Sequence, residues 1–531
     1  MGDRAGFLIR AGWGTVFALF LFLCFPFRVG EVRFDLGAVA GWIALVPFVL
    51  MLRGLRPGAA FRWAVSAATA AFAGILFWIF VVVHVHGHGA VWVAIGAVLL
   101  LALYMALHTG VAAALFVKLT PSAGPFGLLV LPAAWVVCEH LRSFDLFGGF
   151  PWAYMGYAMH RDGPVLELAA FVGVWGLSFL LATVAVLVAQ RRFVVAMGLL
   201  AAVHGLGFGL RVANTQSTRD EAYSVALVQA SVPQGEKWDP ELAWAGFEEH
   251  LTLSRLAAAT RELDLILWPE TSAPVLLEIE SRYASAVQQL ARETGAIVVL
   301  GGVGFERLSL SQSSRDYRIF NSVFAVTPES GFVDRYDKSH LVPFGEYVPL
   351  RDLLSFLSAV ASGIAMGDLT PGSGPRTLRN LPPGGPDHAL APLICYEVIY
   401  PSLVRKAVRS GARVLLNLTN DAWYGRTSAP HQFLAIAAMR SAEHGLPMLR
   451  AANTGVSAVI DAGGMVLSET PIFEQHALPS RLPEVRSGPT VYTRYGDWVV
   501  WASWGFLIGI GGLGFVRRGQ PTNQGDSPGS R

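Results

Sequence analysis

Long apolar runs, separated by short segments that contain charged residues, Pro or Gly, fill the first 214 residues. A hydrocarbon layer about 30 Å thick needs roughly 20 apolar residues in a helix, and eight runs approach that length. They cover approximately residues 9–27, 35–52, 63–83, 90–117, 125–141, 165–189, 193–212 and 497–516. The pattern predicts an α-helical transmembrane bundle of about eight spans, with about seven in residues 1–214 and a C-terminal span at residues 497–516.

The middle of the chain has a different pattern, in which short β-rich apolar runs alternate with amphipathic stretches such as 243–260 and 278–294. The expected strands include residues 224–228, 263–267, 297–300, 322–326, 390–394 and 414–417. Strands that alternate with helices indicate an α/β layered sandwich in residues 215–496. Residues 351–390 are rich in Pro and Gly, which predicts a long loop of the kind that can cover a site.

The composition separates the same regions. Hydrophobic residues make up 53% of the 531 residues and charged residues 15%, a balance too apolar for an ordinary soluble enzyme. Residues 1–214 carry 20 charged side chains, residues 215–496 carry 53 and residues 497–531 carry 5. The net charge of +2 indicates neither a nucleic-acid-binding surface nor an acidic disordered chain. Cys24, Cys138 and Cys395 cannot all pair, so no disulfide framework is expected.

The short connections between the apolar runs carry Lys and Arg unevenly, and the richer side is expected to be cytoplasmic. The richer set has ten: Arg4, Arg10, Arg53, Arg56, Arg62, Lys118, Arg191, Arg192, Arg517 and Arg518. The poorer set has four: Arg28, Arg33, Arg142 and Arg161. This difference predicts that both termini, including the tail 517–531, are cytoplasmic. In a bacterium, residues 215–496 would then lie in the periplasm.

Three reactive side chains in the middle region lie at strand ends or in an irregular segment. Cys395 follows the apolar run 390–394, where a thiol can face a cleft and react as a thiolate near a helix N-terminus or a cation. Glu270 ends the segment Ile-Leu-Trp-Pro-Glu, and strand-end carboxylates project into functional crevices. Lys338 precedes a segment with Pro and Gly. Each has an ordinary interpretation alone, as a buried apolar thiol, a helix cap and a solvated lysine, but together they suit acyl transfer.

These segments resemble, in order, the Glu-Lys-Cys motifs of the nitrilase, or carbon-nitrogen hydrolase, superfamily. The matching pieces are Trp-Pro-Glu at Glu270, Lys338 with the following His-Leu-Val-Pro-Phe-Gly-Glu, and Ile-Cys-Tyr-Glu around Cys395. Segments 417–425 and 450–455 match as well. The resemblance implies an α-β-β-α sandwich with Glu270 as the general base, Lys338 as the cation that stabilises the oxyanion, and Cys395 as the nucleophile.

The combination of this domain with the apolar runs resembles the apolipoprotein N-acyltransferase family over about residues 9–516. Further matches are Gly-Phe-Pro-Trp at 149–152, Lys-Trp-Asp at 237–239 and the segment 342–349. The resemblance implies that a phospholipid, usually phosphatidylethanolamine, donates an acyl chain through a Cys thioester to the N-terminal amine of a diacylglyceryl-cysteine apolipoprotein. It implies a multi-pass protein of the bacterial inner membrane that uses no metal and no other cofactor. The alternative is a membrane-tethered amidase with the same triad.

Four further residues are expected to support the triad. By the same resemblance, Glu346 orients Lys338 or polarises Glu270, Tyr396 lines the site, and Trp238 and the loop 351–390 border the lipid entry. Glu397 holds the nucleophile loop or the lysine. The ordinary alternatives are that the two glutamates cap backbone N–H groups at a helix start and that Trp238 only packs. The alternating histidines at positions 84, 86 and 88 favour a solvated interface loop over a metal site.

Overall fold

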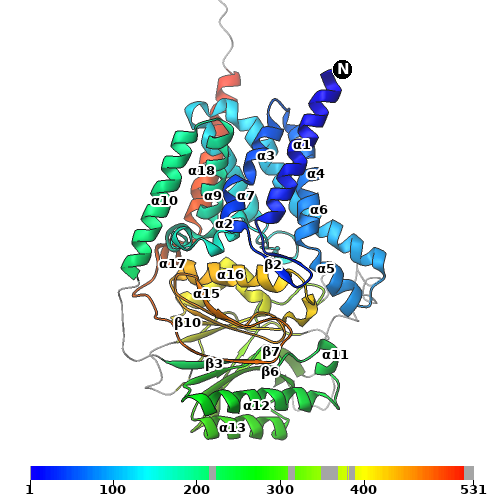
Figure 1. Cartoon of the computed structure of the whole chain (residues 1–531), viewed down its shortest axis with the longest axis vertical. Helices are drawn as coiled ribbons and strands as arrows, with labels where there is room; N and C mark the ends of the chain where they lie inside the picture. The colour runs from blue at the N-terminus through cyan, green and yellow to red at the C-terminus, as the bar shows by residue number, and fades with distance from the viewer. Residues whose placement is uncertain are drawn as a thin grey trace, which may run out of the picture.

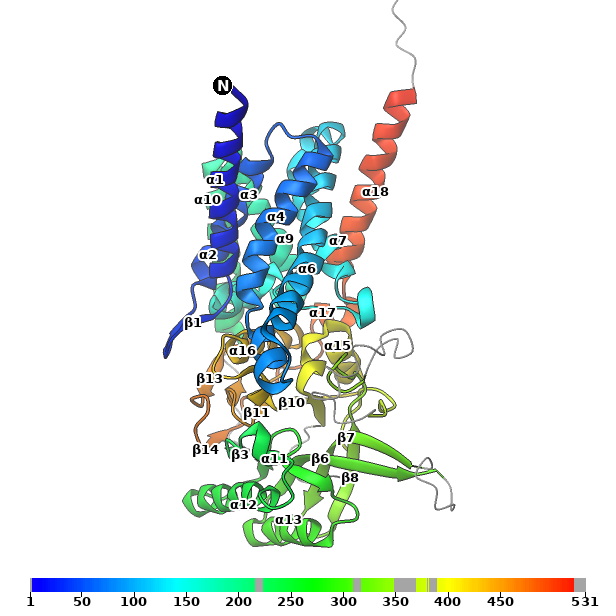
Figure 2. The same cartoon turned by 90° about the vertical axis from the view of Figure 1, so that its right-hand side faces the viewer.

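The computed structural model describes residues 2–214, 223–308, 317–347, 369–379, 381 and 389–519. It has two parts, a bundle of long helices and an α/β sandwich stacked on one end of that bundle (Figure 1). The first helix begins and the last helix ends at the opposite end of the bundle, far from the sandwich (Figures 1 and 2). The predicted domain borders remain predictions, and residues 215–222, beside one of them, lie outside the described residues.

The bundle follows the predicted apolar runs. Its main helices are α1 (Gly2–Leu23), α2 (Gly37–Ile43), α3 (Leu45–Leu52), α4 (Pro57–Ile75), α5 (Trp78–Val81), η1 (Val82–His86), α6 (Val91–Leu119), α7 (Val130–Leu141), α9 (Ala169–Ala189), α10 (Phe193–Asn214) and α18 (Trp498–Gly519). Small side chains bring two of these helices close together. Ala60, Ala64 and Ala68 are fully buried along α4, and a Cβ on Gly110 of α6 would lie 2.6 Å from a methyl group of Val65.

The number of spans differs from the eight expected. Within the described residues, five helices are long and apolar enough to cross a membrane, and a sixth span results if the bent pair Pro57–Ile75 and Trp78–His86 is counted as one. The bend in that pair is 55°. The other two predicted runs are helical but shorter, at Gly37–Leu52 and Trp498–Leu513. The described residues therefore form a multi-pass membrane protein with five to six candidate spans.

The sandwich contains two sheets. The larger sheet has seven strands, with β14 (His476–Arg481), β3 (Ser224–Gln229), β4 (Leu265–Leu267), β6 (Ile297–Arg307), β7 (Tyr317–Thr327) and β8 (Gly331–Asp337) in that order, and β5 (Ala273–Leu276) beside β6. The smaller sheet has the order β13 (Val466–Glu469), β12 (Ala458–Ile460), β11 (Met448–Ala452), β10 (Val414–Thr419) and β9 (Leu390–Ile394). Strands β9, β10 and β11 are parallel, so their carboxyl ends lie on one side.

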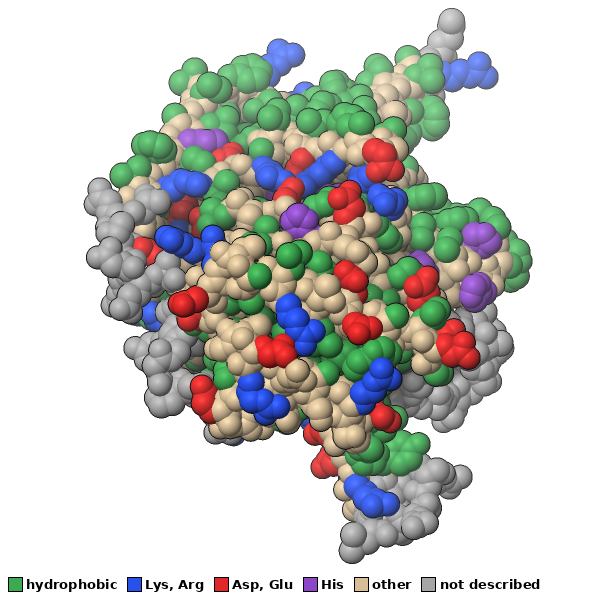
Figure 3. All heavy atoms as spheres, turned by 60° about the horizontal axis from the view of Figure 1, so that its bottom comes forward, with side chains coloured by type: hydrophobic (Ala, Val, Ile, Leu, Met, Phe, Trp, Pro, Cys, Tyr) green, Lys and Arg blue, Asp and Glu red, His purple; other side chains and the backbone are tan. Residues whose placement is uncertain are grey.

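Helices cover the outside of both sheets, which gives the α-β-β-α order of the expected fold (Figure 1). The larger sheet is covered by α12 (Ala243–Thr260) and α13 (Ser281–Thr294), and α13 buries Tyr283, Val287 and Leu290 at helical spacing. The face beyond these helices carries interspersed acidic and basic side chains (Figure 3). The smaller sheet is covered by α15 (Pro401–Arg409) and α16 (Ala429–His444), which lie between this sheet and the bundle.

Polar contacts join α16 to the membrane helices. Gln432 accepts a hydrogen bond of 2.8 Å from Trp152 Nε1 and donates to the backbone carbonyls of Pro26 and Ile75, each at 3.2 Å. The backbone N–H of Val174, beside the break in α9, donates to Glu443 at 2.8 Å. Because every residue of α16 is buried, the bundle and the sandwich share one continuous interior.

Candidate active site

Glu270 lies just beyond β4, and its side chain is 8% exposed. Asn321 Nδ2 donates to Glu270 Oε1 at 2.8 Å, and Lys338 Nζ lies 3.3 Å from the same oxygen. The backbone N–H of Asn420, which follows β10, donates to Oε2 at 2.8 Å. Donors from both sheets therefore hold the carboxylate in one orientation.

Lys338 directly follows β8, and its side chain is 1% exposed. Its Nζ donates to Glu346 Oε1 at 2.8 Å as well as lying 3.3 Å from Glu270. The backbone N–H of Val342 donates to the other oxygen of Glu346 at 2.8 Å. One buried ammonium thus bridges two carboxylates that the sequence places 76 residues apart, from Glu270 to Glu346.

Cys395 follows β9 and begins the short 3-10 helix η7 (Cys395–Ile399). Its φ of +49° is rare for a residue with a side chain and costs on the order of 1–3 kcal/mol. Asn417 Nδ2 stabilises the turn by donating to the carbonyl of Leu393 at 2.8 Å and to that of Cys395 at 3.4 Å. A sharp strand-to-helix turn of this kind presents a nucleophile at the end of a sheet.

The electrostatics keep the three side chains in different protonation states. Burial raises the pKa of the Cys395 thiol, as do the charges of Glu270 and Asp421, although Lys338 opposes them. Burial also acts against the charge on Glu270, but Lys338, Asn321 and the Cys395 thiol hold the pKa of that carboxyl below its ordinary value. The carboxylates of Glu346 and Glu270 overcome burial and raise the pKa of Lys338. The resting site therefore holds a neutral thiol beside a charged carboxylate and ammonium.

Glu397 is fully buried and connects the Cys395 turn to the loop of Lys338. Its Oε1 accepts hydrogen bonds from the backbone N–H and hydroxyl of Ser339, both at 2.7 Å, and from the backbone N–H of His340 at 3.2 Å. Its Oε2 accepts from the backbone N–H of Ile394 at 2.8 Å. Tyr336 donates to the same carboxylate at 2.9 Å. The contacts of Glu397 thus position both loops, whereas Glu346 contacts the ammonium itself.

Tyr396 and Trp238 have less definite positions in the site. The Tyr396 ring is buried, lies 5.3 Å from the Tyr400 ring and stacks at 6.4 Å on His340. Trp238 is half-buried at the end of the short helix α11 (Gln234–Lys237), and its Nε1 has no hydrogen-bond partner among the described residues. Of the loop 351–390, only residues 369–379, 381 and 389–390 are described, so its predicted role as a lid lies largely outside the described residues.

Comparisons with known proteins agree with both parts of the chain. The family model of the carbon-nitrogen hydrolases matches residues 224–479, and that of the apolipoprotein N-acyltransferase N-terminal domain matches residues 17–187. An apolipoprotein N-acyltransferase of Geobacter metallireducens is 36% identical over 90% of this chain and 91% of that protein. One of Methylococcus capsulatus is 35% identical over 85% of this chain and 88% of that protein. The chain belongs to the apolipoprotein N-acyltransferase family.

The chain is also similar to a solved amidase of the nitrilase superfamily from Nesterenkonia. That similarity covers 54% of this chain and 99% of the amidase, with 21% sequence identity and a TM-score of 0.38. The curated relatives, in contrast, extend over both the bundle and the sandwich. Membership of the apolipoprotein N-acyltransferase family therefore accounts for the membrane helices as well as for the nitrilase-like sandwich.

The sequence did not single out several polar residues that surround the three central side chains of this apolipoprotein N-acyltransferase family member. Asn321 lies within the apolar strand β7, where a buried polar residue between Phe320 and Val323 was the available signal. Beside the thiol, Arg450 donates to Asp421 at 2.8 Å and also to Asn417. Segments 417–425 and 450–455 both resemble the nitrilase pattern, but nothing in the sequence indicates that they contact each other.

Proposed function

We propose that this chain transfers an acyl group from a membrane phospholipid to the N-terminal amine of a diacylglyceryl-cysteine apolipoprotein, through a thioester on Cys395. Family membership supports the overall reaction. The observation that carries the mechanism is the convergence of a buried ammonium and a buried carboxylate, 3.3 Å apart, on the turn that presents Cys395. A nucleophile, a proton acceptor and a fixed cation are the groups that acyl transfer requires.

In the first half-reaction, Glu270 accepts the thiol proton as the sulfur attacks the ester carbonyl of the phospholipid. The new C–S bond gives a tetrahedral intermediate, and the ammonium of Lys338 neutralises its oxyanion. A preorganised donor at such a position contributes about 3–4 kcal/mol of transition-state stabilisation. The C–O bond then breaks, and the lysophospholipid leaves with the proton that Glu270 returns. The acyl chain remains on Cys395 as a thioester.

The second half-reaction uses the same groups. The apolipoprotein amine attacks the thioester carbonyl, and Glu270 accepts a proton from the attacking nitrogen. Lys338 again neutralises the oxyanion. When the C–S bond breaks, the sulfur leaves as a thiolate and takes the proton from Glu270. The amide product and the original thiol result, so the cycle balances without an oxidant, a reductant or a cofactor.

The membrane part supports this reaction by bringing the site to its lipid substrates. Both substrates keep their acyl chains in a bilayer, and the sandwich is stacked directly on the end of the helix bundle (Figure 2). Tyr400, next to the Cys395 turn, donates to the carbonyl of Gly149 in the bundle at 3.1 Å. We include Tyr396 as a lining residue, and Trp238 with the loop 351–390 as the border of the lipid entry.

The orientation in the membrane is part of this proposal. We propose that the protein lies in the bacterial inner membrane, with the sandwich in the periplasm and both termini in the cytoplasm. The excess of Lys and Arg in one set of connections supports this orientation. Helix α1 begins and helix α18 ends at the side of the bundle away from the sandwich, which supports it too (Figure 1). A reporter enzyme that is active only in the periplasm is expected to be active when it is fused within residues 223–308. An inactive reporter at that position would contradict the proposed orientation.

Intact mass spectrometry after exposure to phosphatidylethanolamine vesicles tests the mechanism. The unmodified protein is expected to gain the mass of one acyl chain, and Cys395→Ala to gain none. Cys24→Ala is the matched control, because Cys24 is fully buried in the bundle and should leave the adduct intact. An acyl adduct on Cys395→Ala would show that the nucleophile lies elsewhere. Addition of a diacylglyceryl-peptide should yield N-acylated peptide, and free fatty acid in its place would favour the amidase alternative.

A further inference from the structure

Arg450 is a fully buried arginine behind the nucleophile turn, and the mechanism above gives it no role. It lies on β11, and its side chain and that of Asp421 are both 0% exposed. Its guanidinium donates to Asp421 at 2.8 Å, to Asn417, and to the carbonyl of Val456 at 3.2 Å. A buried cation is costly unless its donors are used, so these partners indicate what the guanidinium holds in place.

The strand order places Asn417 between Arg450 and the turn of Cys395. In the parallel register of the smaller sheet, Asn417 on β10 pairs with Arg450 on β11 and with Leu393 on β9. Leu393 lies two residues before Cys395. A side chain on the central strand can therefore reach the turn on one side and the guanidinium on the other.

The amide of Asn417 supports the turn in one of its two orientations. Its Nδ2 donates to the carbonyls of Leu393 and Cys395 at 2.8 and 3.4 Å, and an amide oxygen in that place could not bond to either. A guanidinium has donors but no acceptor, so Arg450 bonds to the oxygen of this amide. Arg450 thereby selects the orientation in which the NH₂ group faces the turn.

The guanidinium is itself held in one position. Asp421 accepts from Arg450 with Oδ2 and from the hydroxyl of Thr419 with Oδ1, both at 2.8 Å. A Cβ on Gly455 would lie 2.0 Å from Asp421 Oδ2, so a side chain there would displace the carboxylate. The ring of Phe433 on α16 has its centroid 4.4 Å from the guanidinium carbon. A cation fixed on several sides is suited to hold a neighbouring amide still.

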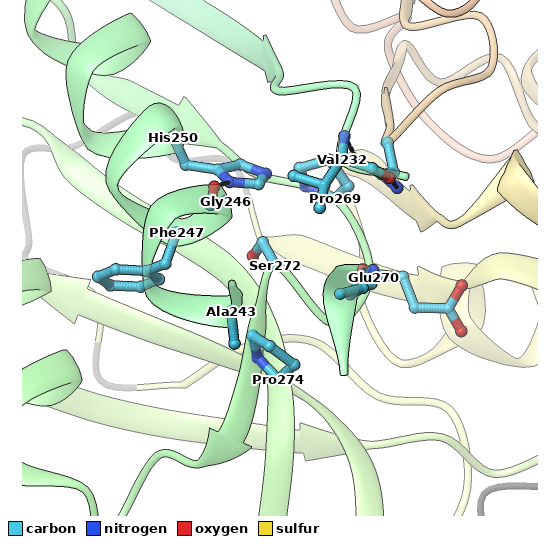
Figure 4. A pocket seen from close by; sticks show the side chains of 11 residues that line it. Val232, Ala243, Gly246, Phe247, His250, Pro269, Glu270, Ser272 and Pro274 are labelled. Atoms are coloured by element: carbon cyan, nitrogen blue, oxygen red, sulfur yellow. Dashed lines mark hydrogen bonds between the residues drawn. The ribbon is translucent and has the colours of Figure 1, made fainter. Parts of the chain in front are cut away.

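The base is held mainly from the other sheet. Figure 4 shows the Glu270 carboxylate pointing away from the labelled wall of a small cavity, which is formed partly by α12. Asn321 on β7 and Lys338 after β8 contact this carboxylate at 2.8 and 3.3 Å, and the backbone N–H of Asn420 adds one contact from the smaller sheet. Loss of the Arg450 contacts is therefore expected to displace the nucleophile turn more than the base.

We propose that Arg450 is a positioning residue for the nucleophile and acts through the amide of Asn417. It keeps that amide in the orientation that supports Cys395 at its strained φ of +49°. The inference rests on the proposed function, in which Cys395 carries the acyl group. A misplacement of about 1 Å lowers a rate by on the order of 100-fold, so loss of this support should slow acylation without abolishing it.

Removal of both members of the ion pair separates positioning from stability. Arg450→Met with Asp421→Asn leaves no unpaired buried charge, so we expect a melting temperature close to that of the parent protein. Acyl-adduct formation from phosphatidylethanolamine vesicles should nevertheless be about 10- to 100-fold slower. The matched control is Arg440→Met with Glu443→Gln, an equally buried pair on α16, which should keep the parent rate. A parent-like rate in the Arg450 variant would overturn the inference.

A comparison of combined variants tests the route through Asn417. Asn417→Leu should slow adduct formation to a similar extent, because it removes the group on which Arg450 acts. Its combination with Arg450→Met and Asp421→Asn should then be no slower than Asn417→Leu alone. Rate losses that multiply would overturn the inference, since Arg450 would then act through another group.

Arg450→Lys keeps a counter-ion for Asp421 and decides the outcome if the variant without the ion pair does not fold. A compact ammonium cannot reproduce the planar fork that reaches both Asn417 and Asp421, so we expect a folded protein with slow acylation. A parent-like rate in Arg450→Lys would contradict the positioning role. The proposed function fails separately, if the parent protein itself gains no acyl adduct after exposure to phospholipid.

Discussion

The two sheets of the sandwich contribute different kinds of support to one site. The seven-stranded sheet supplies charged groups, since Glu270, Lys338 and Glu346 all follow its strands and the ammonium contacts both carboxylates. The five-stranded sheet supplies a backbone conformation, since Cys395 sits at a φ of +49° and the amide of Asn417 braces its turn. A change on the first side is therefore expected to alter charge and pKa, and a change on the second side to alter geometry and stability.

Removal of the cation should have the largest effect. Lys338→Met leaves Glu270 and Glu346 buried together without a counter-ion, so both the oxyanion and the charged base lose their partner. We expect acyl-adduct formation to fall by about 10²–10³-fold, which corresponds to the 3–4 kcal/mol of one preorganised donor. Lys338→Arg should also be largely inactive, because a planar guanidinium cannot take the place of a compact ammonium between two carboxylates.

Quenched-flow mass spectrometry measures the rate of acyl-enzyme formation in both variants. Lys406→Met, at an exposed lysine, is the control. Near-normal turnover by Lys338→Arg would contradict the oxyanion role. It would also mean that the site needs a positive charge at position 338 but not the compact shape of an ammonium.

Loss of the Glu397 carboxylate, which links the Cys395 turn to the loop of Lys338, should have the second-largest effect. Glu397→Gln keeps the volume of the side chain but replaces one accepting oxygen with an NH₂ group, which cannot accept from Ile394 or from Ser339 and His340. A buried donor left unpaired costs about 1–3 kcal/mol. We expect a lower melting temperature and about 10- to 100-fold slower acylation. Glu248→Gln, on the exposed face of α12, should change neither; a stable but inactive Glu397→Gln would point to a direct role in the chemistry.

The sequence predicted the parts of this structure that depend on local pattern. Apolar length located every membrane helix, and strand-like runs located β3, β4, β9 and β10, because burial on both faces produces continuous apolar segments. It did not reveal the breaks at Ala44 and Leu76, which separate α2 from α3 and α4 from α5. Such breaks depend on packing against neighbouring helices, which a hydrophobic run does not encode.

The same distinction holds within the site. Glu270, Lys338 and Cys395 could be singled out because each is a reactive group at a strand end or in an irregular segment, within a short ordered motif. Asn321 could not, since its role arises from a contact with Glu270 over 51 positions of the chain. The sequence also left open whether Glu397 holds the nucleophile loop, holds the lysine or only caps backbone N–H groups at a helix start. Its bond from the N-cap residue Ile394 is of the capping kind, and its bonds from Ser339 extend to the loop of Lys338. Those roles need the three-dimensional arrangement of partners.

A change that displaces the backbone beside Glu270, on the seven-stranded sheet, should have a moderate effect on the rate of acylation. Gly301→Ala places a methyl group within 2.4–2.7 Å of the backbone atoms of Thr271 and Glu270, which must move. Overpacking of this kind costs about 1–3 kcal/mol, and a displaced base lowers the rate by about tenfold or more. Gly198→Ala, on α10 with open space around it, is the control. Unchanged acylation by Gly301→Ala would show that the charged side tolerates movement of its backbone.

The smallest expected effect is a shift in pH dependence. Asn321 donates to Glu270 and Glu346, and Asn321→Leu removes one of the groups that hold the Glu270 pKa below 4.5. Because this pKa is lowered in the folded protein, Glu270 stays charged at pH 5, and its contribution to activity and stability is lost only as the pH falls through the lowered value. In Asn321→Leu the loss should begin at a higher pH, so the acylation rate at pH 5 relative to pH 7 should fall by a few-fold.

Gln289→Leu removes a similar amide from the exposed carboxylate of Glu293 on α13 and should leave the profile unchanged. An unaltered acid limb in Asn321→Leu would mean that Lys338 alone sets the charge of the base, and the contrast between the two sheets would then rest on one ion pair.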